Sequence, residues 1–114
     1  MSKVLIVDDN EDMRFLLMST LKRNGFDEVD EASSGAEAVF LAGQDQPSIV
    51  ILDYMMPGMD GERTAKILKS LAPKVQIVVF SAYLEAEPAW ADAYLTKDRM
   101  PELLPLIKSL DAGA

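Results

Sequence analysis

The stretch SIVILDYMMPGMDG, residues 48–61, holds the pattern that decides the fold. Its first part, residues 48–53, is a short apolar run that ends at Asp53, which is typical of a buried strand. The second part, MMPGMDG, predicts a loop. Asp60 is suited to cap a following helix. The inward residues of that helix are expected to be Thr64, Ile67, Leu68 and Leu71.

The same alternation of strand and helix runs along the whole chain. Continuous apolar strands separated by amphipathic helices predict a parallel sheet that is covered on both faces. The fold class is therefore α/β, with a doubly wound five-stranded parallel sheet. The expected strands are residues 3–7, 28–32, 48–53, 75–81 and 93–96.

Apolar residues at helical spacing lie between these strands. The first helix is expected to carry Met13, Leu16, Leu17, Thr20 and Leu21, with Gly25 as its C-terminal glycine. Ser34 and Glu37 predict a capping box for a second helix, which carries Ala38, Val39 and Ala42.

The last helix lies in residues 100–110. It is expected to begin at Pro101 or later, so that Pro105 falls in its first turn. A kink at Pro105 is the alternative.

The composition limits the classes of function that the chain can have. The chain has 114 residues, which suits one domain, and 11 basic against 19 acidic residues give a net charge of −8. Such an acidic protein repels nucleic acids and anionic membranes. No segment reaches the roughly 18 apolar residues of a membrane span, and there is neither cysteine nor histidine. We expect a soluble cytoplasmic protein whose chemistry rests on carboxylates, hydroxyls, lysines or a metal.

Reactive side chains follow the strands at one edge of the predicted sheet. They are Asp8, Asp9, Asp53, Ser81 and Lys97. Ligands of open α/β sheets bind beyond the carboxyl ends of the strands. Each residue alone also has an ordinary interpretation: a helix cap, a turn hydroxyl or a solvated charge. Their placement on successive strand ends favours a shared site.

Three carboxylates in one place repel one another unless a cation joins them. Oxygen ligands without histidine or cysteine favour a hard metal, Mg²⁺ first and Mn²⁺ second. With the metal, a lysine and a hydroxyl could hold three phosphoryl oxygens, and an aspartate could form an aspartyl phosphate. The set therefore predicts magnesium-dependent phosphoryl chemistry.

Four motifs resemble the receiver domain of two-component response regulators, the CheY-like fold. They are DYMMPGMDG at 53–61, VLIVDDNEDMR at 4–14, VVFSA at 78–82 and AYLTKD at 93–98. The resemblance covers the whole chain and implies the strand order 2-1-3-4-5. The KD ending is typical of receivers that carry a helix-turn-helix output domain. We expect no such domain here: residues 1–114 form the receiver, either stand-alone or truncated.

The resemblance also implies a role for individual residues. Asp53 is expected to be the phosphoacceptor. The metal ligands would be Asp9 directly, Asp8 partly through water, Asp53, and the backbone carbonyl of Met55. The phosphoryl group would be bound by Ser81 and Lys97, with small Ala82 leaving it room.

Other positions are expected to act as a switch and to set the lifetime of the acyl phosphate. Ser81 and Tyr94 stand where the family has its switch residues, although Tyr94 could instead be a fixed aromatic of an edge strand. Met55 and Tyr83 are bulky where relatives position water, which predicts slow self-dephosphorylation.

The implied function is a phosphoacceptor in a two-component phosphorelay, not a conventional enzyme. The phosphoryl donor would be a sensor histidine kinase or a histidine phosphotransfer protein, and the output an unknown downstream protein. Three alternatives stay open: a pseudo-receiver that binds partners without turning over phosphate, a magnesium-dependent phosphohydrolase, and a flavin-binding module.

The chain departs from the family in the connection between the fourth and fifth strands, about residues 81–91, which is shorter than the family's usual one. The return along five strand residues is about 17 Å. A helix would use about eleven residues for this distance, and the shortest crossovers need about 10–12 residues in total. This connection also contains Pro88. We therefore expect the fourth helix to be absent or shortened to about one turn, with Leu84 and Trp90 covering the sheet face.

Overall fold

The computed structural model describes residues 2–56, 60–83 and 88–113. It has a five-stranded sheet in the order β2-β1-β3-β4-β5, and all neighbouring strands are parallel. This topology confirms the predicted α/β class and strand order. The strands are β1 (Val4–Val7), β2 (Val29–Ala32), β3 (Ile49–Leu52), β4 (Gln76–Ser81) and β5 (Ala93–Thr96).

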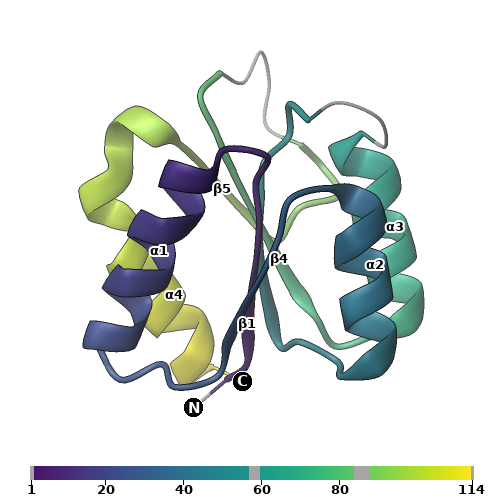
Figure 1. Ribbon diagram of the computed structural model, residues 1–114, viewed down its shortest axis with the longest axis horizontal. Helices are drawn as coiled ribbons and strands as arrows, with labels where there is room; N and C mark the ends of the chain where they lie inside the picture. The colour runs from purple at the N-terminus through teal and green to yellow at the C-terminus, as the bar shows by residue number, and fades with distance from the viewer. Residues whose placement is uncertain (1, 57–59, 84–87, 114) are drawn as a thin grey trace.

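Helices cover both faces of the sheet (Figure 1). On one face lie α1 (Glu11–Arg23) and α4 (Leu103–Ala112), and on the other lie α2 (Gly35–Gln44) and α3 (Gly61–Leu71). A short 3₁₀ helix, η1 (Lys97–Glu102), connects β5 to α4.

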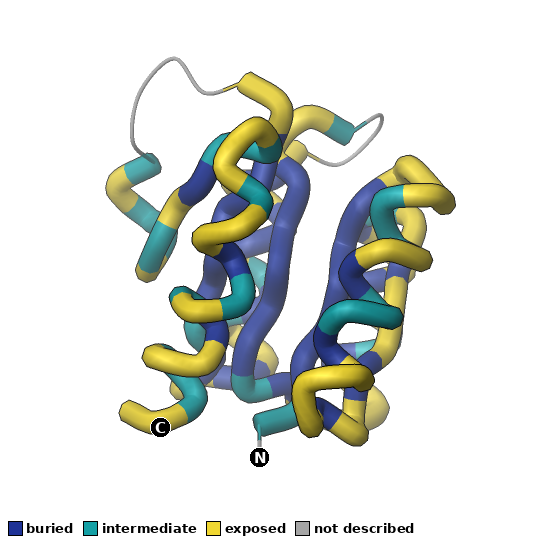
Figure 2. The backbone as a smooth tube through the Cα atoms, turned by 90° about the vertical axis from the view of Figure 1, so that its left-hand side faces the viewer, coloured by how far each residue is buried: buried dark blue, intermediate teal, exposed yellow. Residues whose placement is uncertain are grey.

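Two hydrophobic cores lie between the sheet and the helices. Strand side chains alternate between the faces, so Val4 and Ile6 join the core under α1 and α4, while Leu5 and Val7 join the core under α2 and α3. Figure 2 shows the buried strands between outward helix faces that are largely exposed. A sheet buried on both faces explains why its central strands are uninterrupted apolar runs.

Short polar side chains set the start of each long helix after a strand. The side chains of Asn10 and Asp60 accept hydrogen bonds from the backbone N–H groups of Met13 and Arg63, at 2.9 and 2.8 Å. These bonds satisfy N–H groups that have no partner within the helix. After α1, Gly25 has a φ of 93°, a conformation that favours glycine, as expected for a C-terminal glycine.

The predicted capping box of α2 forms with a shifted partner. Ser34 Oγ accepts from the N–H of Glu37 at 3.1 Å, as expected. The Glu37 carboxylate accepts from the N–H of Ser33 at 2.8 Å, one residue before the cap.

The structure shows how two residues of the predicted helices, Leu71 and Pro105, are placed. Leu71 was expected to face inward, but it is 36% exposed at the last position of α3. Pro105 is the third residue of α4. It therefore lies in the first turn, where its missing N–H costs no helical hydrogen bond, as predicted.

The crossover segment, residues 82–92, joins β4 to β5. Among its described residues, 82, 83 and 88–92, none is helical. A helix of two turns would need about seven residues and would extend into these positions. The prediction of one helical turn at most falls partly on residues 84–87, which lie outside the described residues. The expected role of Leu84 falls wholly on them. Trp90 packs against the core under α2 and α3, as predicted.

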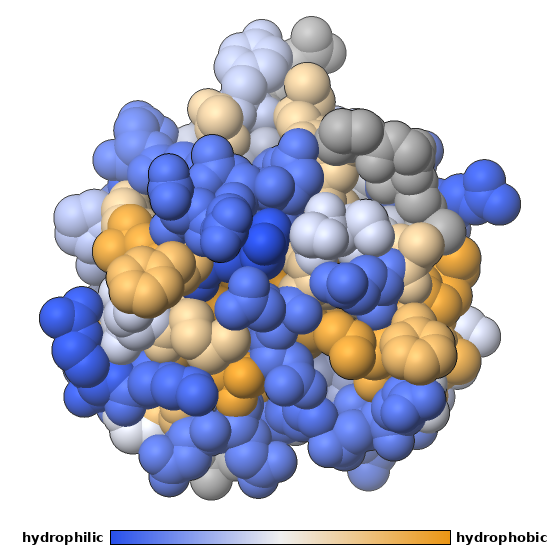
Figure 3. Space-filling model, in the orientation of Figure 1, coloured by the Kyte–Doolittle hydropathy of each residue, from blue (hydrophilic) through white to orange (hydrophobic). Residues whose placement is uncertain are grey.

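Surface properties agree with the composition. Among the described residues, no helix is long and apolar enough to cross a membrane. Large exposed hydrophobic side chains include Phe15 on α1 and Phe40 on α2. Figure 3 shows separate hydrophobic groups among hydrophilic side chains on this face.

Candidate functional site

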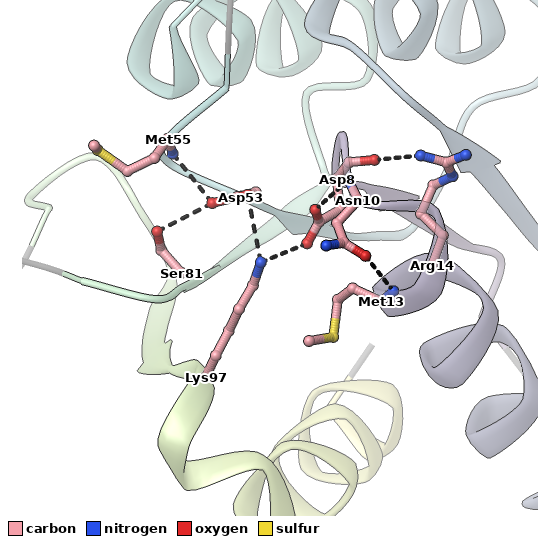
Figure 4. Close-up of polar contacts among 8 residues, drawn as sticks. All are labelled: Asp8, Asn10, Met13, Arg14, Asp53, Met55, Ser81 and Lys97. Atoms are coloured by element: carbon pink, nitrogen blue, oxygen red, sulfur yellow. Dashed lines mark hydrogen bonds and ion pairs between the residues drawn. The ribbon is translucent and has the colours of Figure 1, made fainter.

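The carboxyl edge of the sheet brings the predicted site residues together (Figure 4). Asp8 follows β1, Asp53 follows β3, Ser81 ends β4 and Lys97 follows β5. Parallel strands end at the same edge, so residues far apart in sequence meet there. Asp8, Asp53 and Ser81 are buried, with at most 5% of each exposed.

Asp53 lies at the centre of the hydrogen bonds. Its Oδ1 accepts from the hydroxyl of Ser81 at 3.0 Å and from the N–H of Met55 at 3.1 Å. The ammonium of Lys97 donates to Asp53 Oδ2 at 3.4 Å and to Asp8 Oδ2 at 2.8 Å. Lys97 therefore bridges two carboxylates, with its shorter contact on Asp8.

These contacts change how readily the groups ionise. Burial raises the pKa of Asp53, and the Asp8 charge adds to this, while the Met55 N–H, Lys97 and Ser81 act in the opposite direction. Burial by itself lowers the pKa of Lys97, but its hydrogen bond to Asp8 and the two carboxylate charges outweigh it, so this pKa is raised. Lys97 is thus held as a cation beside a carboxylate that is costly to ionise.

The acidic residues are arranged to hold a cation. One carboxylate oxygen from each of Asp8, Asp9 and Asp53 lies within 4.8 Å of the other two. With Lys97 as the cation in contact with two of them, three negative charges and one positive charge leave a net charge of −2. Oxygen ligands with this charge fit Mg²⁺, which binds through few carboxylates and keeps several waters.

Other residues predicted for the site lie at its rim. Met55 is 61% exposed, and its N–H donates to Asp53; metal binding by its carbonyl stays a prediction. Ala82 and Tyr83 are exposed just after Ser81. Tyr94 is 41% exposed on β5, as expected of a residue on an edge strand, and its switching role stays a prediction.

Two residues near the site were not predicted to take part in it. The N–H of Asn10 donates to Asp8 Oδ1 at 2.9 Å, so Asn10 both caps α1 and orients an acidic side chain. Arg14 Nη1 donates to the backbone carbonyl of Asp8 at 2.8 Å. The available signal was position: both lie in the segment that connects the aspartates to the first turn of α1.

Comparison with known proteins agrees with this geometry. The sequence profile of the family described as "Response regulator receiver domain" matches residues 4–107. The chain therefore belongs to the response regulator receiver domain family.

Individual relatives give the same result. The chain is 39% identical over 80 residues to chemotaxis protein CheY of Bacillus subtilis, a match covering 70% of this chain and 67% of CheY. It is 32% identical over 85 residues to sporulation initiation phosphotransferase F of the same organism, covering 75% and 68%. Other relatives are longer: the chain spans 49% of response regulator MprA of Mycolicibacterium vanbaalenii and 58% of a Pseudomonas aeruginosa relative.

Solved structures share the fold along nearly the whole chain. Response regulator TrrA of Thermotoga maritima, in complex with Mg²⁺-BeF, has a TM-score of 0.87 at 31% identity, covering 96% of this chain and 99% of TrrA. CheY4 of Vibrio cholerae has a TM-score of 0.85 at 30% identity, covering 96% and 98%. The receiver fold is thus retained in spite of the short crossover segment.

Proposed function

We propose that this chain is a phosphoacceptor receiver of a two-component phosphorelay and that Asp53 is its phosphorylation site. The observation that carries the proposal is the arrangement around Asp53. One of its oxygens accepts from Ser81, and the other faces Lys97, which also contacts Asp8. A buried carboxylate between a fixed cation and a hydroxyl is suited to become an acyl phosphate and to have its new charges bound.

The proposed reaction is a transfer between two side chains. An oxygen of the Asp53 carboxylate bonds to the phosphorus of a phosphohistidine, and the P–N bond breaks. Its electron pair stays on the imidazole, which takes up a proton. Lys97 then pairs with one phosphoryl oxygen, and Ser81 donates its hydroxyl to another. Ala82 leaves room beside Ser81 for the group.

A divalent ion completes the proposed site. When bound, Mg²⁺ would neutralise charge on the phosphoryl oxygens, and Mn²⁺ could take the same place. The residues that would hold it are Asp8, Asp9, Asp53 and the carbonyl of Met55. The Mg²⁺-BeF complex of the related TrrA supports this assignment.

The phosphohistidine donor would lie outside residues 1–114, because these residues contain no histidine. We propose a sensor histidine kinase or a histidine phosphotransfer protein in the cytoplasm. Phosphorylation would alter binding to a downstream protein. The net charge of −8 disfavours nucleic acids and anionic membranes as direct partners.

A second candidate is a pseudo-receiver that binds partners without accepting phosphate. The observation that favours it is the crossover segment, whose described residues are not helical. A surface that many receivers use for output would therefore differ in this chain.

Acetyl phosphate, a small phosphoryl donor, separates the two candidates. The protein is incubated with acetyl phosphate and Mg²⁺, and the adduct is measured by intact mass. A stoichiometric adduct that is lost without Mg²⁺ and in Asp53→Asn is expected. If no adduct forms although Mg²⁺ is shown to bind, the pseudo-receiver is the correct assignment.

A further inference from the structure

Arg14 lies beside the acidic residues and contacts both the end of β1 and β2. Its Nη1 donates to the backbone carbonyl of Asp8 at 2.8 Å, and its Nε donates to Glu31 Oε1 of β2 at 2.8 Å. Its side chain is 14% exposed. The guanidinium thus connects the end of β1 to β2 from the first turn of α1.

This contact fixes the segment where the chain leaves the sheet. On one side, the N–H of Asp8 donates to Ala32 of β2. Beyond it, Asp8 and Asp9 must present two carboxylates before Asn10 caps α1. The Arg14 bond to the Asp8 carbonyl fixes the peptide between these two aspartates. Figure 4 shows Arg14 reaching Asp8 from α1, on the side away from Lys97.

The two cations near the acidic residues differ in what they contact. Lys97 contacts the carboxylates of Asp8 and Asp53. The hydrogen bonds of Arg14 go to a backbone carbonyl and to Glu31. Because Glu31 pairs with the guanidinium, Arg14 can shape the segment without itself occupying the carboxylates of Asp8 and Asp9.

We infer that Arg14 is a positioning residue for the divalent cation, holding the peptide between Asp8 and Asp9 so that their carboxylates converge. This role rests on the metal site of the proposed function. It assigns to Arg14 an effect on metal affinity without direct contact with the metal. Partners of metal ligands typically change metal affinity by about 10- to 100-fold when they are removed.

The sign of the effect distinguishes positioning from simple electrostatics. Removing a positive charge near a cation site should strengthen cation binding if charge alone mattered. Loss of the bond to the Asp8 carbonyl should weaken binding instead. Arg14→Lys keeps the charge, but a single ammonium does not reproduce the planar fork that reaches both partners. The Mg²⁺ affinity of Arg14→Lys should therefore lie between that of wild type and that of Arg14→Ala.

The experiment measures Mg²⁺ affinity of the unphosphorylated protein by calorimetric titration. Arg14→Ala is expected to bind about tenfold more weakly, and Arg14→Lys less weakly than that. Arg23→Ala is the matched control, because Arg23 is on the same helix and its Nε donates to the carbonyl of Ser19. It should bind Mg²⁺ as wild type does. Amide hydrogen exchange of Asn10 should accelerate in Arg14→Ala, since its N–H is bonded to Asp8.

Each other outcome overturns a distinct claim. Unchanged or tighter Mg²⁺ binding in both Arg14 variants would overturn the positioning role. Equal weakening in Arg23→Ala would assign the effect to general stability of α1. If wild type itself bound no Mg²⁺, the metal site of the proposed function would be wrong, and the role of Arg14 with it. Thermal unfolding of each variant shows whether it is folded. If Arg14→Ala is not folded, the Mg²⁺ affinity of Arg14→Lys decides the test.

Discussion

The carboxyl edge of the sheet and the crossover segment meet at Ser81, yet they are held by different residues. At the edge, Asp53 and Asp8 are buried, and each makes hydrogen bonds to several groups. In the described part of the crossover segment, Trp90 stacks on Tyr54, with ring centroids 6.1 Å apart and planes 13° apart. Hydrogen bonds of buried carboxylates thus hold the carboxyl edge, whereas an aromatic stack holds this part of the crossover segment.

A second anchor closes the crossover segment at its end. Asp92 Oδ2 accepts from the N–H of Ile77 at 2.7 Å and from Lys69 of α3 at 2.8 Å. The segment is therefore fixed to β4 and α3 just before β5 begins. The carboxyl edge and the crossover segment thus rely on separate contacts, so the crossover segment can change while the candidate site is kept.

The largest expected effect comes from removing Lys97. Lys97→Met should slow adduct formation from acetyl phosphate by about 10²-fold, because a cation aimed at the transferring group is lost. The initial rate by intact mass measures this. Lys66→Met is the control, since the Lys66 side chain is 71% exposed on α3. A small change for Lys97→Met would contradict the role of this cation at the transferring group.

Trp90→Ala tests the crossover segment by itself. It should lower the free energy of unfolding by about 2 kcal/mol, less than for a fully buried tryptophan, because packing and stacking are lost. Urea denaturation measures this, and Tyr83→Ala is the exposed aromatic control. Adduct formation should stay close to the wild-type rate. A large fall in that rate would show that the two regions are coupled.

Asp92 offers a finer comparison of charge and hydrogen bonding. Asp92→Ala leaves the N–H of Ile77 without its acceptor and should cost about 1–2 kcal/mol in urea denaturation. Asp92→Asn keeps an acceptor and should cost less, because an exposed pair such as Lys69–Asp92 contributes little. Equal losses for the two variants would instead assign the anchor to the ion pair.

The smallest expected effect concerns the raised pKa of Asp53. A carboxyl whose pKa is raised by folding binds its proton more tightly in the folded state. Without Mg²⁺, the free energy of unfolding of wild type should therefore fall relative to Asp53→Asn as pH rises above the ordinary value of 3.8. The decline should end once pH passes the raised pKa. Denaturation of both proteins across this range measures it, and a parallel pH dependence would show that Asp53 is not destabilising.

Much of the fold and of the candidate site was predictable from the sequence because it depends on local patterns. Apolar runs located the strands, and Ser34 and Asp60 marked helix starts. The order of strands came from the resemblance, whereas the places of Asp8, Asp53, Ser81 and Lys97 just after successive strands already predicted that they would meet. The topology confirmed that order.

The remaining features depend on tertiary contacts that no local pattern specifies. The bond from Arg14 to the Asp8 carbonyl requires the angle between α1 and β1. The partner of Trp90 depends on how the crossover segment returns over the sheet, and Tyr54 next to the proposed phosphoacceptor was not foreseen in this role. Leu71 has the spacing of an inward residue but lies where α3 ends, so periodicity alone misplaced it.

The residue that carries the phosphoryl group can be identified chemically. Protein labelled with acetyl phosphate and Mg²⁺ is reduced with borohydride, which converts an aspartyl phosphate to homoserine, and its peptides are sequenced by mass spectrometry. We expect homoserine at position 53, with Asp8 and Asp9 unchanged and no phosphate on Ser81. Modification at one of those residues in place of Asp53 would contradict the assignment of the site.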